Sequence, residues 1–292
     1  MVLGIDIGGT FIKVVGKDEN DNIFKEKISV NFQDKKTFVN EILKIVEKHR
    51  PSKVGIAIAG LVDKKSGQLT NSPNLKFLEG LNLKQEIENQ RNIKVFIEND
   101  ANLAAYGEYV YGNGKDSEIL VCLTLGTGLG GGAVIGGKIL SGVSGSAMEI
   151  GHIVVEKNGL LCHCGRNGCL EAYVSSYGLE RIYCMLTEKK ITSFEIVNLA
   201  KNKDEKALKS FEMFSDYLST GIMNIAHIFN PDKILLAGGI IEHYPDILEI
   251  VREKAKNLIF PLPLRDLKID MAKLGSWSGA FGALAFAEGH SS

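Results

Sequence analysis

The chain has 292 residues, of which 45% are hydrophobic and 24% are charged. These proportions are typical of a globular protein of one large or two ordinary domains, and they argue against intrinsic disorder and against a coiled coil. The 34 basic and 35 acidic residues give a formal net charge of −1. A near-neutral chain shows no overall electrostatic footprint for nucleic acid or an anionic membrane, although a local patch stays open.

The apolar stretches of the chain are strand-sized, well short of the ~20 residues that a membrane-spanning helix needs. The opening residues, MVLGIDIGGT, contain neither the basic segment nor the small-residue cleavage site of a signal peptide. We therefore expect a cytoplasmic protein that binds neither nucleic acid nor a membrane.

The first part of the chain alternates apolar stretches with amphipathic ones, which predicts strands and helices in turn. Strands are expected over residues 2–7, 11–15, 23–30, 54–59 and 95–98. Helices are expected over residues 35–48 and 83–89 and from Asn99-Asp100 to about residue 111.

A second half begins near residue 115 and repeats the opening arrangement of strand, turn rich in glycine and threonine, and strand. Strands are expected over residues 119–125, 133–135, 138–140 and 234–237, and helices over 204–229, 244–257 and 277–288. Asn230-Pro231 ends the long helix, because proline cannot continue it. The alternation predicts an α/β fold, and the repeat suggests two similarly built halves that each offer a glycine loop to the same ligand.

Three glycine turns follow apolar strands, and such turns expose backbone N–H groups that can cradle a phosphate. They lie in the segments GIDIGGT (residues 4–10), LTLGTGLGGG (residues 123–132) and LAGGI (residues 236–240). In the first turn Thr10 adds a hydroxyl donor and Lys13 adds a cation. A hairpin turn with a capping aspartate explains one such loop, but three make coincidence less convincing. None is a Walker A loop, and the hairpin expected after GTGLGG argues against a Rossmann fingerprint.

Three cysteines and a histidine have the spacing of a metal site. His152 precedes, by nine intervening residues, the run Cys162-x-Cys164-x4-Cys169. One imidazole and three thiolates suit a closed tetrahedral zinc site, with His163 as a competing ligand. Because no export signal is present, ligation is favoured over a disulfide framework. Glycines at 159, 165 and 168 would let the loop fold tightly around the ion.

Several carboxylates complete a polar set. Asp6 lies inside an apolar strand, where a carboxylate is costly unless it is paired or binds a metal. Asp100 lies at a strand-to-helix junction, where it can act either as a helix N-cap or as a general base. Glu149 and Glu171 flank the cysteine loop, so a zinc ion would fix both in space without taking part in the chemistry. Such a cluster suits a polyol such as a sugar.

These motifs resemble those of the ROK family (repressors, open reading frames and sugar kinases) of the sugar kinase/actin-like superfamily. The resemblance runs nearly from end to end and is most specific at the cysteine run with its trailing glutamate. Its segments are GIDIGGTFIK (4–13), IAIAG (56–60), SPNL (72–75), ENDAN (98–102), LTLGTGLGGG (123–132), EIGH (149–152), CHCGRNGCLE (162–171) and LAGGI (236–240).

The resemblance implies a duplicated RNase H-like fold with two α/β lobes and a nucleotide–sugar cleft between them. The first lobe would span residues 1–116. The second would span residues 117–276 and carry the zinc loop, and the terminal helix (277–292) would pack back on the first lobe.

The resemblance also assigns roles to residues of this chain. The implied cofactor-binding set comprises Asp6, Gly8, Gly9, Thr10, Lys13, Gly126, Thr127 and Gly128 around the phosphates, with Gly238 and Gly239 by the adenosine. The implied sugar-binding set comprises Gly60, Asn74, Asn99, Asp100, Glu149, His152 and Glu171, with Asp100 as the catalytic base. The implied zinc ligands are His152, Cys162, Cys164 and Cys169.

The implied activity is that of an ATP- and Mg²⁺-dependent hexose kinase that phosphorylates the 6-hydroxyl of glucose, as in glycolysis. We expect a homodimer or homotetramer whose partners are a small-molecule sugar and MgATP. The form C-x-C-G-x-x-G-C-x-E looks like that of glucokinases and amino-sugar kinases, so N-acetylmannosamine is the alternative substrate. Many members have a Pro-Gly-Trp-like segment after SPNL, and its replacement here by residues 76–80 (KFLEG) leaves the sugar less certain.

Three alternatives compete with this expectation. Sugar-responsive repressors of the family carry an additional N-terminal helix-turn-helix domain, and the first phosphate strand at residue 2 leaves no room for one. A polyphosphate donor is disfavoured because the sequence has no long basic run. A non-catalytic sugar-binding protein would be expected to lack Asp100.

Overall fold

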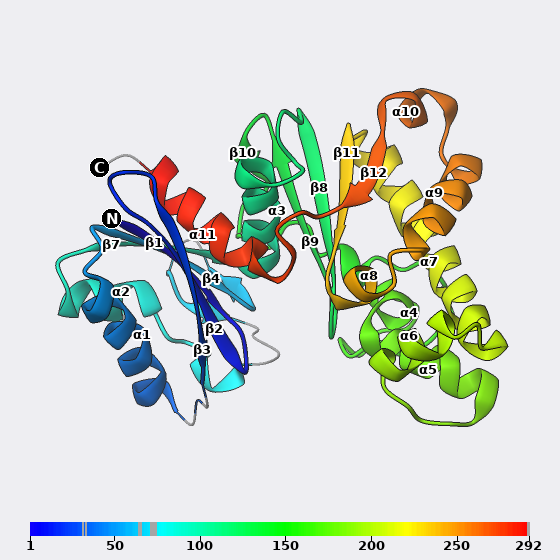
Figure 1. Cartoon of the computed structure of the whole chain (residues 1–292), viewed down its shortest axis with the longest axis horizontal. Helices are drawn as coiled ribbons and strands as arrows, with labels where there is room; N and C mark the ends of the chain where they lie inside the picture. Colours follow the sequence, from blue (N-terminus) through cyan, green and yellow to red (C-terminus); the bar gives the residue numbers. More distant parts are fainter. Residues whose placement is uncertain (31, 33, 64–65, 71–74, 291–292) are drawn as a thin grey trace. The chain divides into compact units, whose positions relative to one another are not determined.

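The computed structural model describes residues 1–30, 32, 34–63, 66–70 and 75–290 (Figure 1). The chain forms two compact units. Unit 1 comprises Met1–Lys115, Ile139–Ala147 and Trp277–Ser292, and unit 2 comprises Asp116–Lys138 and Met148–Ser276. The segment Ile139–Ala147, which the expected lobe boundaries place in the second lobe, thus groups with unit 1.

Unit 1 is built on a five-stranded sheet with the order β3-β2-β1-β4-β7. The bounds of its strands are β1 Val2–Ile7, β2 Phe11–Lys17, β3 Ile23–Ser29, β4 Lys53–Ile58 and β7 Lys94–Asn99. Strand β2 pairs antiparallel with β1 and β3, whereas β1, β4 and β7 run parallel. The short strands β5 Leu61–Val62 and β6 Leu69–Thr70 form a separate hairpin.

Side chains on successive strand residues point to opposite faces of the sheet. Each face of the unit 1 sheet therefore packs against different helices. On one face, Leu3, Ile5 and Ile7 form an apolar core with Phe38 and Ile42 of helix α1. The helices of unit 1 are α1 Lys35–His49, η1 Lys76–Leu78, α2 Leu83–Gln90, α3 Asp100–Tyr111 and α11 Ser278–Gly289. In Figure 1, α1 and α11 lie on opposite sides of this sheet.

The backbone of helix α11 lies directly against the other face of the sheet, where glycines take the place of side chains. A Cβ on Gly4 of β1 would lie 2.1 Å from the carbonyl oxygen of Ala280. A Cβ on Gly55 of β4 would lie 1.8 Å from the carbonyl oxygen of Ala283. Both distances are far inside van der Waals contact, so only glycine fits at either position.

Unit 2 repeats this topology in a second five-stranded sheet, with the order β10-β9-β8-β11-β12. The bounds of its strands are β8 Ile119–Leu125, β9 Leu129–Ile135, β10 Lys138–Ile139, β11 Lys233–Ala237 and β12 Lys268–Met271. Strand β9 pairs antiparallel with β8, while β11 pairs parallel with both β8 and β12. The predicted α/β repeat is confirmed, because in both sheets a hairpin is continued by two parallel strands.

The helices of unit 2 are concentrated after the cysteine loop. Their bounds are η2 Ile150–His152, α4 Glu171–Val174, α5 Ser176–Thr187, α6 Ser193–Lys201, α7 Glu205–Phe229, α8 Gly239–His243, α9 Ile247–Leu258, α10 Pro261–Asp266 and η3 Gly275–Trp277. Helix α7 ends at Phe229, and its C-cap Asn230 is left-handed with φ 46° and precedes Pro231, as predicted. The helix expected over 244–257 is wrong at its start, because α9 begins only at Ile247, after Pro245. A separate short helix, α8, precedes Tyr244. Within the described residues, no helix has both the length and the apolarity to cross a membrane.

We expect Gly55→Ala to destabilise unit 1. The added methyl group must push α11 away from β4, and overpacking of a well-packed core costs about 1–3 kcal/mol of unfolding free energy. Urea denaturation measures this loss. Gly9→Ala is the matched control, because a Cβ at Gly9 would have no neighbour within 4 Å. Equal stability of the two variants would contradict the close contact between α11 and the sheet.

Candidate functional site

The candidate residues of unit 1 collect at one edge of its sheet. Strands β1, β4 and β7 are parallel, and their register pairs Ile7 with Ile58 and Ile58 with Asn99. Their carboxyl ends therefore lie together, and the turn after each strand carries candidate residues: Gly8 to Thr10, Gly60, and Asn99 with Asp100. Ligands of open α/β sheets bind at such strand ends. Asn74, also expected to bind the sugar, lies outside the described residues.

The first glycine turn joins β1 to β2. The backbone N–H of Gly8 donates to the carbonyl of Phe11 at 3.0 Å, which closes the turn. Gly9 and Thr10 are exposed, so their N–H and hydroxyl groups are accessible to a ligand. Lys13 pairs in register with Asp6, and its Nζ lies 3.9 Å from Asp6 Oδ2.

The Asp6 carboxyl lies in surroundings that disfavour its charged form. Burial raises the pKa of Asp6 to about 7, although Lys13 lowers it and the nearby Asp100 adds to the rise. Helix α11 begins beside this carboxyl, since a Cβ on Gly279 would lie 2.9 Å from Asp6 Cγ. A carboxyl so costly to ionise is a natural ligand for a cation, because a nearby positive charge favours the charged form.

Asn99, not Asp100, is the N-cap of helix α3. The Asn99 side-chain oxygen accepts from the backbone N–H groups of Ala101 and Asn102, at 2.9 and 3.1 Å. Its amide nitrogen donates to the carbonyl of Gly60 at 3.0 Å, which ties β7 to the turn after β4. Asn99 therefore fills the capping position that the sequence had left open to Asp100.

Asp100 is the first residue of α3. Burial raises the pKa of the Asp100 carboxyl, although hydrogen bonds from the backbone, including that of the Ala101 N–H, lower it. A general base works best when its pKa approaches the pH at which it operates. Asp100 has this direction of shift and lies at the same sheet edge as the first glycine turn.

The candidate glycines of unit 2 lie at the corresponding edge of its sheet. Strands β8 and β11 are parallel with Ala237 opposite Thr124, so the turns after them are neighbours. The Gly126 N–H donates to the carbonyl of Gly128 at 3.0 Å. Gly238 has φ 107°, and a Cβ there would lie 2.2 Å from the carbonyl oxygen of Leu125. Gly238 therefore allows the turn after β11 to pack on the end of β8.

A cavity of about 200 Å³ opens beside these turns. Its lining residues are Gly126, Ser176, Ser193, Phe194, Val197, Gly239, Ile240 and His243. Phe194 and His243 meet edge to face with ring centroids 6.1 Å apart. A flat aromatic group fits such apolar and aromatic walls. Phe194 and Val197 of α6 and His243 of α8 could not be predicted as lining residues, because they belong to no glycine or cysteine motif.

The predicted metal ligands come together. The candidate ligand atoms of His152, Cys162, Cys164 and Cys169 lie within 4.8 Å of one another. Cys162 Sγ lies 3.8 Å from His152 Nδ1, and Cys164 Sγ lies 3.6 Å from Cys169 Sγ. Tetrahedral zinc with Zn–S bonds of 2.3 Å separates two sulfurs by about 3.8 Å. The donor set and its spacing therefore fit a zinc ion.

The loop that carries the cysteines is held in shape by its own backbone. Gly165 and Gly168 have φ values of 85° and 77°, which glycine adopts readily. Burial alone would raise the pKa of Cys164, but hydrogen bonds with Arg166, Cys162 and Cys169 together outweigh it and lower that pKa to about 6. Burial raises the pKa of Cys169. His163, left open as a competing ligand, instead stacks on Tyr177 with ring centroids 3.8 Å apart.

Both candidate glutamates of unit 2 adjoin the cysteine cluster. Glu149 Oε2 lies 3.9 Å from Nε2 of His152, whose Nδ1 faces the cysteines. Glu171 begins α4, and its Oε2 accepts from the Leu129 N–H at 2.9 Å. A Cβ on Gly128 would lie 2.5 Å from that same oxygen, so the glutamate lies against the glycine turn after β8. His152 and Glu171 are thus candidate sugar-binding residues that also contact the cysteine cluster.

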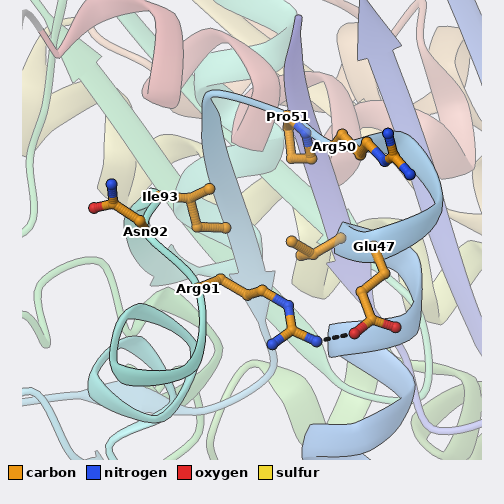
Figure 2. Close-up of a pocket in the computed structure, with 7 residues that line it drawn as sticks. Glu47, Arg50, Pro51, Arg91, Asn92 and Ile93 are labelled. Carbon is orange, nitrogen blue, oxygen red and sulfur yellow. Dashed lines mark hydrogen bonds and ion pairs between the residues drawn. The ribbon is translucent and has the colours of Figure 1, made fainter.

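A second cavity, of about 530 Å³, lies at the opposite end of the unit 1 strands (Figure 2). Its walls come from the end of α1, from Pro51 before β4 and from Ile93 before β7. At its rim Arg91 forms an ion pair with Glu47 (Figure 2). This cavity is at the amino ends of the parallel strands, whereas every unit 1 candidate described above follows a carboxyl end or, like Asp6, lies near one.

The sequence and fold of this chain are similar to those of known proteins. The model of the ROK family matches residues 2–290 of this chain. The glucokinase of Thermotoga maritima is 30% identical, over 97% of this chain and 95% of its own. The crystal structure of a ROK family glucokinase from Streptomyces griseus, in complex with glucose and AMPPNP, is 32% identical, covers 99% of both chains and has a TM-score of 0.84.

A regulator is similar as well. The xylose repressor of Bacillus subtilis is 34% identical over 78% of this chain, but the match covers 59% of the repressor. This chain therefore spans about three fifths of the length of that relative. The chain belongs to the ROK family, and its duplicated RNase H-like α/β fold confirms the predicted fold class.

Proposed function

We propose that the protein is an ATP-dependent sugar kinase. The observation that carries the proposal is the Asp100 carboxyl, which is not the N-cap of α3 and lies at the same sheet edge as a phosphate-type glycine turn. The end-to-end similarity to a glucokinase crystallised with a sugar and an ATP analogue supports the same function.

In the proposed reaction, Asp100 accepts the proton of a sugar hydroxyl as that oxygen bonds to the γ-phosphorus of ATP. The bond between the γ-phosphorus and the β–γ bridging oxygen breaks, and ADP leaves. Positioning and electrostatic stabilisation carry most of the catalysis of phosphoryl transfer. Gly8, Gly9, Thr10 and Lys13 in unit 1, and Gly126, Thr127 and Gly128 in unit 2, would hold the phosphates. Magnesium, held near Asp6, would neutralise phosphate charge when bound.

The donor is proposed to be ATP. Phe194, His243, Gly126 and Gly239 all line the cavity, so a purine there would lie next to the phosphate-binding turns. Gly238 and Gly239 would then flank the adenosine. Polyphosphate, the other donor considered, has no aromatic group to fill this cavity.

The acceptor is proposed to be glucose, phosphorylated at its 6-hydroxyl. Glu149, His152 and Glu171 are polar acceptors that suit the hydroxyls at carbons 1 to 3, and Asn99 and Asp100 suit those at carbons 4 and 6. Gly60 would border the sugar, because its carbonyl accepts a hydrogen bond from Asn99, which belongs to the same proposed set. Asn74 completes the proposed set. N-acetylmannosamine is the alternative acceptor and needs extra room near Glu171.

Asp100→Asn is expected to lower kcat by about 10²–10⁴-fold, because the amide keeps the size of the carboxyl but cannot take a proton. Sugar affinity should stay close to that of the wild type. Coupled ADP-release kinetics and calorimetry measure the two properties. The control is Asp216→Asn, which removes an exposed ion pair with Lys254 and should leave kcat unchanged. A wild-type kcat in Asp100→Asn would refute the assignment of the base.

Glucose is expected to have the highest kcat/KM among glucose, mannose, N-acetylmannosamine, N-acetylglucosamine and fructose at fixed MgATP. A site that pairs each hydroxyl rejects an analogue lacking one, because buried polar groups are left unpaired. A tenfold advantage for either amino sugar would overturn the choice of glucose while leaving the kinase mechanism intact. Sugar binding without ADP release would instead favour a regulator, the function suggested by the similarity to xylose repressors.

We further propose that His152, Cys162, Cys164 and Cys169 bind a structural zinc ion. The ion would supply no step of the reaction. It would fix His152 and the start of α4, and through them the positions of Glu149 and Glu171.

Cys164→Ser should lose the metal and raise the sugar KM, because the loop that positions Glu171 is no longer anchored. Elemental analysis of the purified protein and steady-state kinetics check both effects. Cys184→Ser makes the same chemical change at a half-buried cysteine of α5 outside the cluster, and it should retain the metal. Full activity in a Cys164→Ser protein without zinc would exclude the structural role of the metal.

A further inference from the structure

Tyr177 lies outside every motif that the sequence analysis singled out, yet its hydroxyl reaches the proposed sugar-binding site. It is the second residue of helix α5 and is half-buried. Its Oη donates to Oε1 of Glu171 at 3.1 Å. The other carboxylate oxygen, Oε2, accepts from the Leu129 N–H at 2.9 Å. The two oxygens of Glu171 are thus held from two different elements.

Two fixed hydrogen bonds define both the position and the plane of a carboxylate, whereas one leaves it free to rotate about its last torsion, which is broad in glutamate. Cys162 Sγ also approaches Oε1, but at 3.5 Å; a thiol is a weak donor, and a zinc-bound thiolate is none. Tyr177 Oη lies 3.6 Å from the same sulfur, farther than from Oε1. Among the described contacts of Oε1, the phenol is therefore the stronger donor.

The ring of Tyr177 is itself held in place. The imidazole of His163 stacks on it with an interplanar angle of 22°, and the Arg181 guanidinium lies 5.3 Å from its centroid. Arg181 also donates to the carbonyl of Leu161 at 2.6 Å. His163 and Leu161 both belong to the cysteine loop, so this loop orients the ring that orients Glu171.

We propose that Tyr177 is a positioning residue for sugar binding: it sets the orientation of the Glu171 carboxylate toward the ring hydroxyls of the sugar. This inference rests on the proposed function. It adds a tyrosine that acts through Glu171 rather than touching the sugar, and it gives His163 a role in holding that tyrosine rather than the metal. Because the sugar keeps these contacts throughout the reaction, the effect falls on binding and not on turnover.

The test compares Tyr177→Phe with the wild type. We expect the glucose Kd, measured by calorimetry without nucleotide, and the glucose KM to rise about tenfold. A carboxylate turned out of position loses its hydrogen bond to the sugar, and a hydrogen bond to a charged group is worth about one power of ten or more in affinity. The values of kcat and ATP KM, and the bound zinc, should stay within about twofold of the wild type.

Tyr173→Phe is the matched control from the preceding helix, α4. Its hydroxyl accepts from the Leu160 N–H at 2.8 Å and its ring stacks on Tyr217, so the variant disturbs the same loop without touching Glu171. We expect an unchanged glucose Kd in this variant. A rise equal to that of Tyr177→Phe would overturn the proposal, because general loosening of the loop would then explain both.

A double-mutant cycle with Glu171→Gln tests whether the effect passes through the glutamate. If Tyr177 acts by orienting Glu171, its substitution has a much smaller effect on glucose Kd in the Glu171→Gln background. Additive effects, or an unchanged Kd in Tyr177→Phe alone, would overturn the proposal. Either result leaves the kinase assignment standing if the wild type releases ADP with glucose, whereas a wild type without sugar-dependent ADP release would refute the kinase itself.

Discussion

Parallel pairing of strands is the constraint on which the rest of the candidate chemistry depends. Strands β1, β4 and β7 in unit 1, and β8 and β11 in unit 2, point their carboxyl ends to one edge of their sheet. Residues far apart in the sequence, such as Gly9 and Asp100, therefore meet at one edge without any side-chain contact being needed. Each unit supplies one such edge, and the duplicated topology explains why glycine turns recur at equivalent places in the chain.

The turns alone would not fix the positions of the polar side chains at these edges. Each unit holds its polar side chains by different contacts. In unit 1, Asn99 caps α3 and binds Gly60, which secures the turns on both sides of Asp100. In unit 2, the cysteine loop holds the polar groups in place. His152 faces the cysteines through one ring nitrogen and Glu149 through the other. Glu171 lies between the loop and the glycine turn after β8. A metal that closes the loop would thus act on sugar binding through geometry alone.

Much of this could be predicted from the sequence, because strands, glycine turns and cysteine spacing are local patterns. The strand over 119–125 and the long helix ending at Asn230 match the structure closely, and the four metal-ligand candidates do come together. What could not be predicted depends on contacts between distant segments. Phe194, His243 and Tyr177 belong to helices whose patterns indicate only burial, and strand β12 has four residues, too few for a clear periodic signal. The capping of α3 by Asn99 rather than Asp100 is decided by backbone geometry, which neighbouring letters do not distinguish.

The central claim is that these strand ends transfer a phosphoryl group from ATP to a sugar. The most direct measurement follows glucose and MgATP with the wild-type protein by ³¹P nuclear magnetic resonance, which identifies each phosphorus-containing product. The account predicts that glucose 6-phosphate and ADP accumulate in equal amounts, and that ATP is not consumed when glucose is left out. Accumulation of inorganic phosphate in place of a sugar phosphate, or no consumption of ATP at all, would contradict it.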